Sequence, residues 1–66
     1  MELTINGEQR EFREGLSVSG LVEQLTMTAG RIAVQLNHEI IQREEWPRTI
    51  LTTGDRLEIV HFVGGG

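Results

Sequence analysis

The chain has 66 residues, of which 38% are hydrophobic and 24% are charged, and this size and composition are typical of one small globular domain. Six arginines against ten acidic residues give a net charge of −4, which disfavours binding to a phosphate backbone. No apolar run approaches the roughly 20 residues that span a membrane, and residues 1–5 do not resemble a secretory signal. We therefore expect a cytoplasmic protein with neither nucleic-acid nor membrane partners.

Cysteine, lysine and tyrosine are all absent, which removes thiol and amine nucleophiles, disulfides and thiolate metal sites. The only histidines, His38 and His61, do not have the spacing of metal ligands with any carboxylate, so we expect no metal site. A Ser-His-acid arrangement is rejected, because Ser17 is better explained as a helix cap and His38 as a turn residue. The chain is therefore predicted not to be an enzyme.

The first residues predict a β-hairpin. Apolar and polar side chains alternate over residues 2–5, and the Asn6-Gly7 dipeptide that follows favours a tight turn. The partner strand, residues 9–13, has Phe12 as its only apolar side chain. We therefore expect this second strand to lie near an edge of the sheet, with its polar side chains in water.

A helix is predicted next, because apolar residues recur at i, i+3, i+4 and i+7. They are Val18, Leu21, Val22 and Leu25. Ser17 is the expected N-cap, and Leu16 stands where a hydrophobic staple would pack against Leu21. Gly20 occupies the position of a capping-box glutamate, so that the cap is incomplete. Residues 26–29 form a last turn or a loop, and Gly30 marks the exit of the helix.

The second half of the chain predicts an interior strand and shorter elements. Ile32, Val34 and Leu36 alternate with more polar neighbours, as in a strand with one face on the helix. A turn at residues 37–38 leads into a short apolar stretch over residues 39–42. Residues 43–46 are long enough for one helical turn, which Pro47 would stop, and Trp46 is expected in the core.

The last strand is expected from about Arg56 through Val63, after a turn at residues 53–55, with Leu57 and Ile59 on its inner face. The element order contains two hairpin-like pairs around one main helix. This order predicts an α+β domain of the β-grasp type, with a mixed sheet packed on that helix. Residues 1–63 would form the domain and residues 64–66 a flexible tail.

The tail, Gly64-Gly65-Gly66, is the strongest functional signal. Three consecutive glycines at one given place arise by chance about three times in ten thousand. Without Cβ atoms, the last residues can enter a narrow site and leave the terminal carbonyl open to attack. Four residues after Phe62 reach at most about 14 Å. The sequence therefore predicts that the terminal carboxylate of Gly66 is presented as a substrate to a partner enzyme.

Val60 and Phe62 add a second signal. If Leu57 and Ile59 face the core, the alternation of a strand turns Val60 and Phe62 toward solvent beside the tail. Exposed apolar side chains there would form a docking patch together with Val63, Gly64 and Gly65. The competing interpretation is that Val60 or Phe62 completes the core of a small domain.

Several segments together resemble the ThiS family, the sulfur carrier proteins of thiamine biosynthesis. The most specific are residues 34–46 (VQLNHEIIQREEW), 54–60 (GDRLEIV) and 63–66 (VGGG). The Gly-Gly ending alone is shared with ubiquitin-like proteins in general. The resemblance covers most of the chain and implies a ubiquitin-like β-grasp fold. The chain departs from the family pattern at Gly20, often acidic, and at His38, often glycine.

The resemblance also implies a mechanism. A ThiF-like adenylating enzyme would use ATP, with Mg²⁺, to activate the Gly66 carboxylate, and the sulfur of a persulfide donor of the cysteine desulfurase type would displace AMP. The resulting thiocarboxylate would donate its sulfur to a ThiG-like thiazole synthase. The chain itself would hold no permanent cofactor.

Three other functions remain open at this stage. A carrier of the molybdopterin type would use the same C-terminal chemistry in another pathway. A ubiquitin-like modifier would end as an isopeptide on target lysines. In a plain β-grasp interaction module, the tail would play no part.

Overall fold

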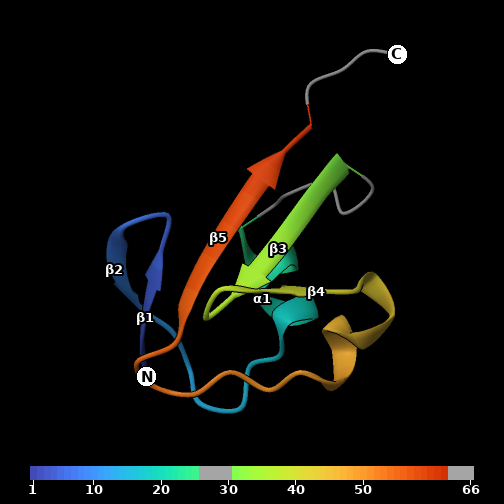
Figure 1. Ribbon diagram of the computed structural model, residues 1–66. Coiled ribbons are helices and arrows are strands. Elements are labelled where there is room, and N and C mark those ends of the chain that lie inside the picture. The colour runs from blue at the N-terminus through green and yellow to red at the C-terminus, as the bar shows by residue number, and fades with distance from the viewer. Residues whose placement is uncertain (26–30, 63–66) are drawn as a thin grey trace.

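The structure, a computed structural model, describes residues 1–25 and 31–62. Within them the chain forms a five-stranded sheet of order β2-β1-β5-β3-β4, in which β1 and β5 are parallel and the other neighbours are antiparallel (Figure 1). The elements are β1 (Glu2–Ile5), β2 (Glu8–Glu11), α1 (Val18–Gln24), β3 (Ile32–Leu36), β4 (Glu39–Ile41), the 3₁₀ helix η2 (Arg43–Arg48) and β5 (Arg56–His61). The predicted α+β class, with a mixed sheet and one main helix, is confirmed.

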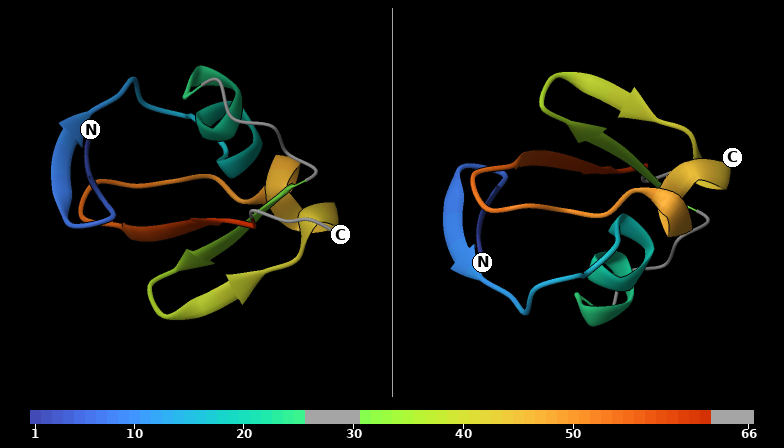
Figure 2. Two further views of the ribbon diagram at one scale, coloured as in Figure 1. Left: turned by 90° about the horizontal axis from the view of Figure 1, so that it is seen from above. Right: turned by 90° about the horizontal axis from the view of Figure 1, so that it is seen from below.

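The sheet curves around α1, which covers one of its faces (Figure 2). The core between them is wholly apolar, because no polar or charged side chain among the described residues is buried. Its largest fully buried side chains come from both layers and from the segments that connect them. They are Leu3, Leu16, Val18, Leu21, Val34, Leu51 and Leu57. No helix of residues 1–25 or 31–62 covers the opposite face of the sheet, and the candidate site lies there.

The first hairpin forms as predicted. Asn6 and Gly7 both have positive φ, 50° and 87°, which is the backbone of the turns that match the twist of a hairpin. The second strand begins one residue earlier than expected, because the register pairs Glu8 with Ile5 directly across the turn, and it ends two residues earlier, at Glu11. All four residues of β2 are exposed and the strand lies at an edge, as the sequence predicted.

The helix begins at its predicted cap. The Ser17 Oγ accepts a hydrogen bond of 3.0 Å from the backbone N–H of Gly20. A Cβ at Gly20 would lie 2.8 Å from Leu16 Cδ1, so the buried Leu16 packs directly over this glycine. A larger residue at this position would therefore require the Leu16 side chain to shift. The predicted last turn and exit, residues 26–30, lie outside the described residues.

The second hairpin joins β3 to β4 through Asn37 and His38, whose φ values are 49° and 74°. His38 therefore takes a left-handed conformation that favours glycine. The short apolar stretch that follows is the edge strand β4. The segment after β4 differs from its prediction, because Pro47 lies inside η2 rather than ending it. Trp46 is buried as expected, and its Nε1–H donates to the carbonyl oxygen of Ile41 at 3.0 Å.

The central strand β5 has the predicted inner face, with Leu57 and Ile59 buried. It ends at His61, two residues before the predicted end, and Val63 lies outside the described residues. The turn before it contains Gly54 at φ 94° and is closed by hydrogen bonds from the backbone N–H of Thr52 to the Asp55 carboxylate and of Asp55 to the Thr52 carbonyl. No helix in residues 1–25 or 31–62 is long and apolar enough to cross a membrane.

Asn6 has a second role, because its side chain holds β5. The Asn6 Oδ1 accepts from the backbone N–H of Ile59 at 2.8 Å, and its Nδ2 donates to the Ile59 carbonyl at 3.2 Å. The side-chain amide of Asn6 thus makes two hydrogen bonds to β5 of the kind that a neighbouring strand makes, at the point where β1 has ended.

We predict that Asn6→Gly, which keeps the positive φ, lowers the free energy of unfolding by about 1 to 2 kcal/mol, because it removes two hydrogen bonds and adds backbone freedom. Amide exchange should accelerate selectively at Ile59, beyond the change seen across the core. Asn37→Gly is the matched control, since it alters the other asparagine turn and leaves Ile59 bonded. Equal acceleration at Ile59 in both variants would contradict this role.

Candidate functional site

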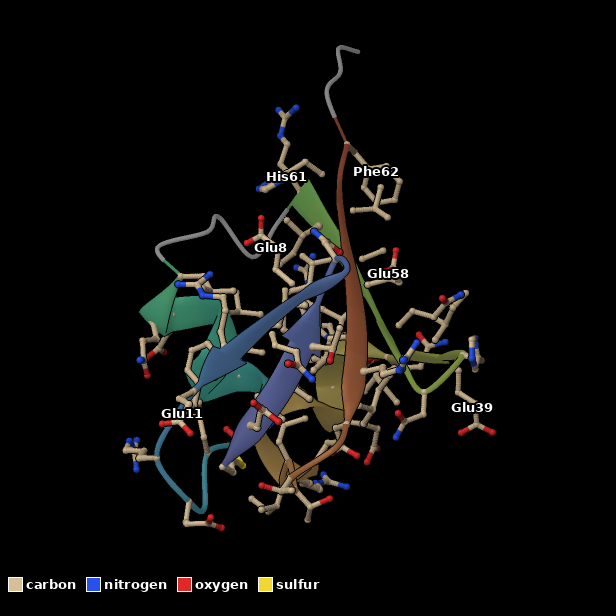
Figure 3. The ribbon with its side chains drawn as sticks, turned by 90° about the vertical axis from the view of Figure 1, so that its left-hand side faces the viewer. Glu8, Glu11, Glu39, Glu58, His61 and Phe62 are labelled. Carbon is tan, nitrogen blue, oxygen red and sulfur yellow. The ribbon has the colours of Figure 1, made fainter. Side chains whose placement is uncertain are left out.

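The candidate site is built on the outer face of β5, the strand that leads into the glycine tail. Figure 3 shows Glu58 and Phe62 on one side of this strand and His61 on the other. The strand is held on both edges, by β1 at its start and by β3 along its length. The last described backbone contact is the Phe62 N–H, which donates to the Arg31 carbonyl at 2.8 Å. The tail therefore leaves from a fixed strand.

Val60 and Phe62 are exposed, by 52% and 60% of their surface. Neither side chain completes the core, so the competing interpretation of these two residues is wrong. Their orientation follows from the regular pleat of β5, in which the register with β3 runs without a bulge from Leu57 to His61. His61 lies on the helix-facing side of β5 but is exposed.

A third apolar side chain, Ile40 on β4, belongs to the same face and is 69% exposed. The sequence pattern alone does not predict this residue, because residues 39–42 show only a short apolar stretch. The available signal was the hairpin: a two-residue turn at residues 37–38 fixes the register, and this register points neighbouring isoleucines to opposite faces. Ile41 packs against the core, and Ile40 faces outward.

These side chains surround a shallow hollow of ≈ 270 Å³ on the outer face. It is lined chiefly by Ala33, Gln35, Ile40, Glu58, Val60 and Phe62. The register explains the arrangement, because Ala33 stands opposite Val60, and Gln35 lies between Ile40 and Glu58. The small side chain of Ala33 leaves the space, and the larger apolar groups form its rim. The hollow therefore combines exposed apolar area with one carboxylate, Glu58.

The remaining predicted site residues, Val63, Gly64, Gly65 and Gly66, lie outside the described residues. They follow directly in the sequence after the outer-face patch, which we define as the exposed side chains of Ile40, Val60 and Phe62. Only Phe62 separates the end of β5 from residue 63. The residues considered for a catalytic triad have other roles in the fold. Ser17 caps α1, His38 forms a turn and His61 ends β5. Among the described residues, no cluster of acidic and histidine side chains could hold a metal ion.

Within the described residues, a five-stranded mixed sheet packs on one main helix, and an apolar patch lies on the strand that precedes the glycine-rich ending of the sequence. These features define a ubiquitin-like β-grasp protein. The ThiS family model matches residues 3–66. The chain belongs to the ThiS family.

Known relatives agree with this assignment. The crystal structure of the thiamine biosynthesis protein ThiS from Geobacter metallireducens is 36% identical, with a TM-score of 0.87 over 100% of both chains. The sulfur carrier protein ThiS of Escherichia coli K12 is 29% identical over 66 residues, the whole of both chains. These names agree with the predicted carrier role and with the expectation that the chain is not a catalyst.

A thiazole synthase of Paramagnetospirillum magneticum is 39% identical over 66 residues. The match covers all of this chain but 20% of that protein, and a second relative named thiazole synthase is covered to the same extent. The chain thus spans about a fifth of the length of these two relatives. A ThiS-like segment and a thiazole synthase therefore occur within one polypeptide in these proteins.

Proposed function

We propose that this chain is a sulfur carrier of thiamine biosynthesis, and that its reactive group is the terminal carboxylate of Gly66. The observation that carries the proposal is the exposed apolar patch of Ile40, Val60 and Phe62. In this member of the ThiS family, two of these residues come shortly before the three glycines that end the sequence. A domain with a wholly apolar core and no cysteine or lysine contributes no side-chain nucleophile of the thiol or amine type. Its chemistry therefore belongs to the end of the main chain.

The first step activates the carboxylate. In this proposal an oxygen of the Gly66 carboxylate attacks the α-phosphorus of ATP in a ThiF-like adenylating enzyme, and pyrophosphate leaves. Activation is needed because a carboxylate anion resists nucleophiles, whereas its mixed anhydride with AMP has a good leaving group. ATP and Mg²⁺ are substrates of that partner, and the carrier supplies only the carboxylate and the docking patch.

The second step transfers sulfur. A persulfide from a donor of the cysteine desulfurase type attacks the Gly66 carbonyl carbon and AMP leaves, which forms an acyl disulfide. A thiol of the partner then breaks the sulfur–sulfur bond, so that the partner keeps a disulfide and Gly66 keeps a thiocarboxylate. A ThiG-like thiazole synthase receives this sulfur, and the relatives that combine both segments in one chain support such a partnership. The carrier would then return to its carboxylate form.

Mass spectrometry tests the proposal. We expect the chain, after incubation with the ThiF-like enzyme of the same genome, ATP and a persulfide donor, to exchange one oxygen for one sulfur. Oxidation of Met1 or Met27 gives nearly the same nominal mass, so a thiol-specific alkylating reagent must label the product. Reactions without ATP serve as controls and should remain unlabelled. A chain that stays unlabelled in the complete reaction would contradict the proposal, and a chain attached to other proteins would indicate a modifier.

A further inference from the structure

The backbone of β5 has an open edge just before the tail. Peptide groups alternate along a strand, so that every second one points to the same neighbour. The Arg56 carbonyl accepts from Asn37 N–H, and the Phe62 N–H donates to Arg31, so the even-numbered groups face the β3 side. The odd-numbered groups face β1, where the Leu57 carbonyl accepts from Asn6 N–H at 2.9 Å. By this alternation, the peptide groups of His61 also point to the β1 side.

On that side, β1 has already ended. It pairs with β5 only through Thr4 and Ile5, and the chain then turns away at residues 6–7 into β2. The Asn6 side chain supplies the next rung at Ile59, as described above. Beyond Asn6, no strand of the described chain pairs with the β1 side of β5. In Figure 3 the end of β5 accordingly continues past the tip of the first hairpin.

We propose that the adenylating partner adds a β-strand to this edge, with main-chain hydrogen bonds to the N–H and C=O of His61. This inference rests on the proposed function, because the occupant is the enzyme that must reach Gly66. Residues 63–66 carry the chain from Phe62 to the proposed reactive carboxylate of Gly66, and four residues span at most about 14 Å when extended. The surface around the partner's ATP site must therefore come within that distance of the end of β5, and His61 is the last residue of that strand.

The alternative edges of the sheet are less suited to such pairing. All residues of β2 are exposed and three of the four are charged, which is a common way of discouraging edge-to-edge association. The other edge strand, β4, is only three residues long and lies across the sheet from β1. At β5, by contrast, hydrogen bonds at Ile59 and Phe62 already hold the strand extended in the free chain. A preordered strand end costs less entropy to pair than a mobile segment.

Amide hydrogen exchange measured by NMR tests the pairing. We expect the His61 N–H to exchange at least 10-fold more slowly when the chain is saturated with the ThiF-like enzyme. The Gln9 N–H of β2 is the matched control, because the alternation in the first hairpin points it away from β1 on the opposite edge of the sheet. Its exchange should be unchanged. An unprotected His61 amide in a complex that still supports adenylation would overturn the pairing and leave the proposed function standing.

An amide-to-ester replacement distinguishes a hydrogen bond to the His61 N–H from protection of that amide by burial alone. The chain is short enough for total synthesis, so the His61 N–H can be replaced by an ester oxygen with the side chain unchanged. We expect this edit to weaken binding to the ThiF-like enzyme at least 5-fold, and the same edit at Gln9 to leave it unchanged. Equal binding by the ester and the amide would overturn the pairing. Failure of the unmodified chain both to bind and to be adenylated would overturn the proposed function and the pairing together.

Discussion

Removal of Gly66 should abolish adenylation of the chain while leaving its stability unchanged. The shortened chain still ends in a carboxylate, but that group is held back by one residue, about 3.5 Å when extended. Displacement of a reacting atom by about 1 Å already costs on the order of 100-fold in rate. We therefore expect ATP–pyrophosphate exchange by the ThiF-like enzyme to fall by at least 100-fold with the shortened chain.

Stability should not change, because all buried core residues described lie between Leu3 and Ile59. Thermal unfolding of the two chains should therefore coincide. Gly66→Ala is the matched control, since it keeps both the length of the chain and its terminal carboxylate. It should retain more exchange activity than the shortened chain. Full activity of the chain without Gly66, or retained formation of the thiazole, would show that the terminal carboxylate is not the reactive group.

Phe62→Ala should weaken binding to the adenylating partner by about 1 to 3 kcal/mol, roughly 5- to 150-fold in Kd. Phe62 is 60% exposed in the free chain and lies beside the hollow, at the point nearest the tail. Burial of a large aromatic side chain against a partner is the commonest source of such an effect. The measurement is a titration of the partner with each variant by calorimetry.

Ile50→Ala supplies the matched control for this prediction. Ile50 is exposed to a similar degree, 54%, but does not line the hollow. The control should bind as the unchanged chain does, and both variants should unfold at nearly the same temperature as the unchanged chain. Unaltered binding by the Phe62 variant would remove the patch from the interface. Unfolding of that variant would mean that Phe62 supports the core.

Periodicity was enough to predict most of the fold. The alternation at residues 2–5 and 32–36 and the helical spacing from Val18 each arise from burial of one face, and burial of one face is visible in a local window. Turn residues with positive φ marked both hairpins. The limits of β2 and β5 were less well predicted, because the pairing partner decides where a strand ends. Pro47 was misplaced because a 3₁₀ helix with few internal hydrogen bonds can accommodate it.

The exposed side chains around the candidate site were predicted in part. Val60 and Phe62 followed from the alternation of β5, since Leu57 and Ile59 identify the inner face. Ile40 did not, because its outward orientation depends on the pairing of β4 with β3. The hollow needed Ala33 to face Val60 across two strands that are distant in the sequence. Local patterns contain no information on such a pair.

The sequence alone thus indicated the family and the order of elements, and it is the source of the chemistry that we propose for the tail. These depend on residue identity: glycines without Cβ atoms, an absence of thiols and amines, and faces marked by alternating side chains. Only the tertiary structure decided which apolar groups meet on the outer face. It also decided that the Asn6 side chain bonds Ile59 in place of a strand, and that no described strand pairs with β5 at His61 on that side. Both depend on the register between strands, which long-range packing sets and no local segment contains.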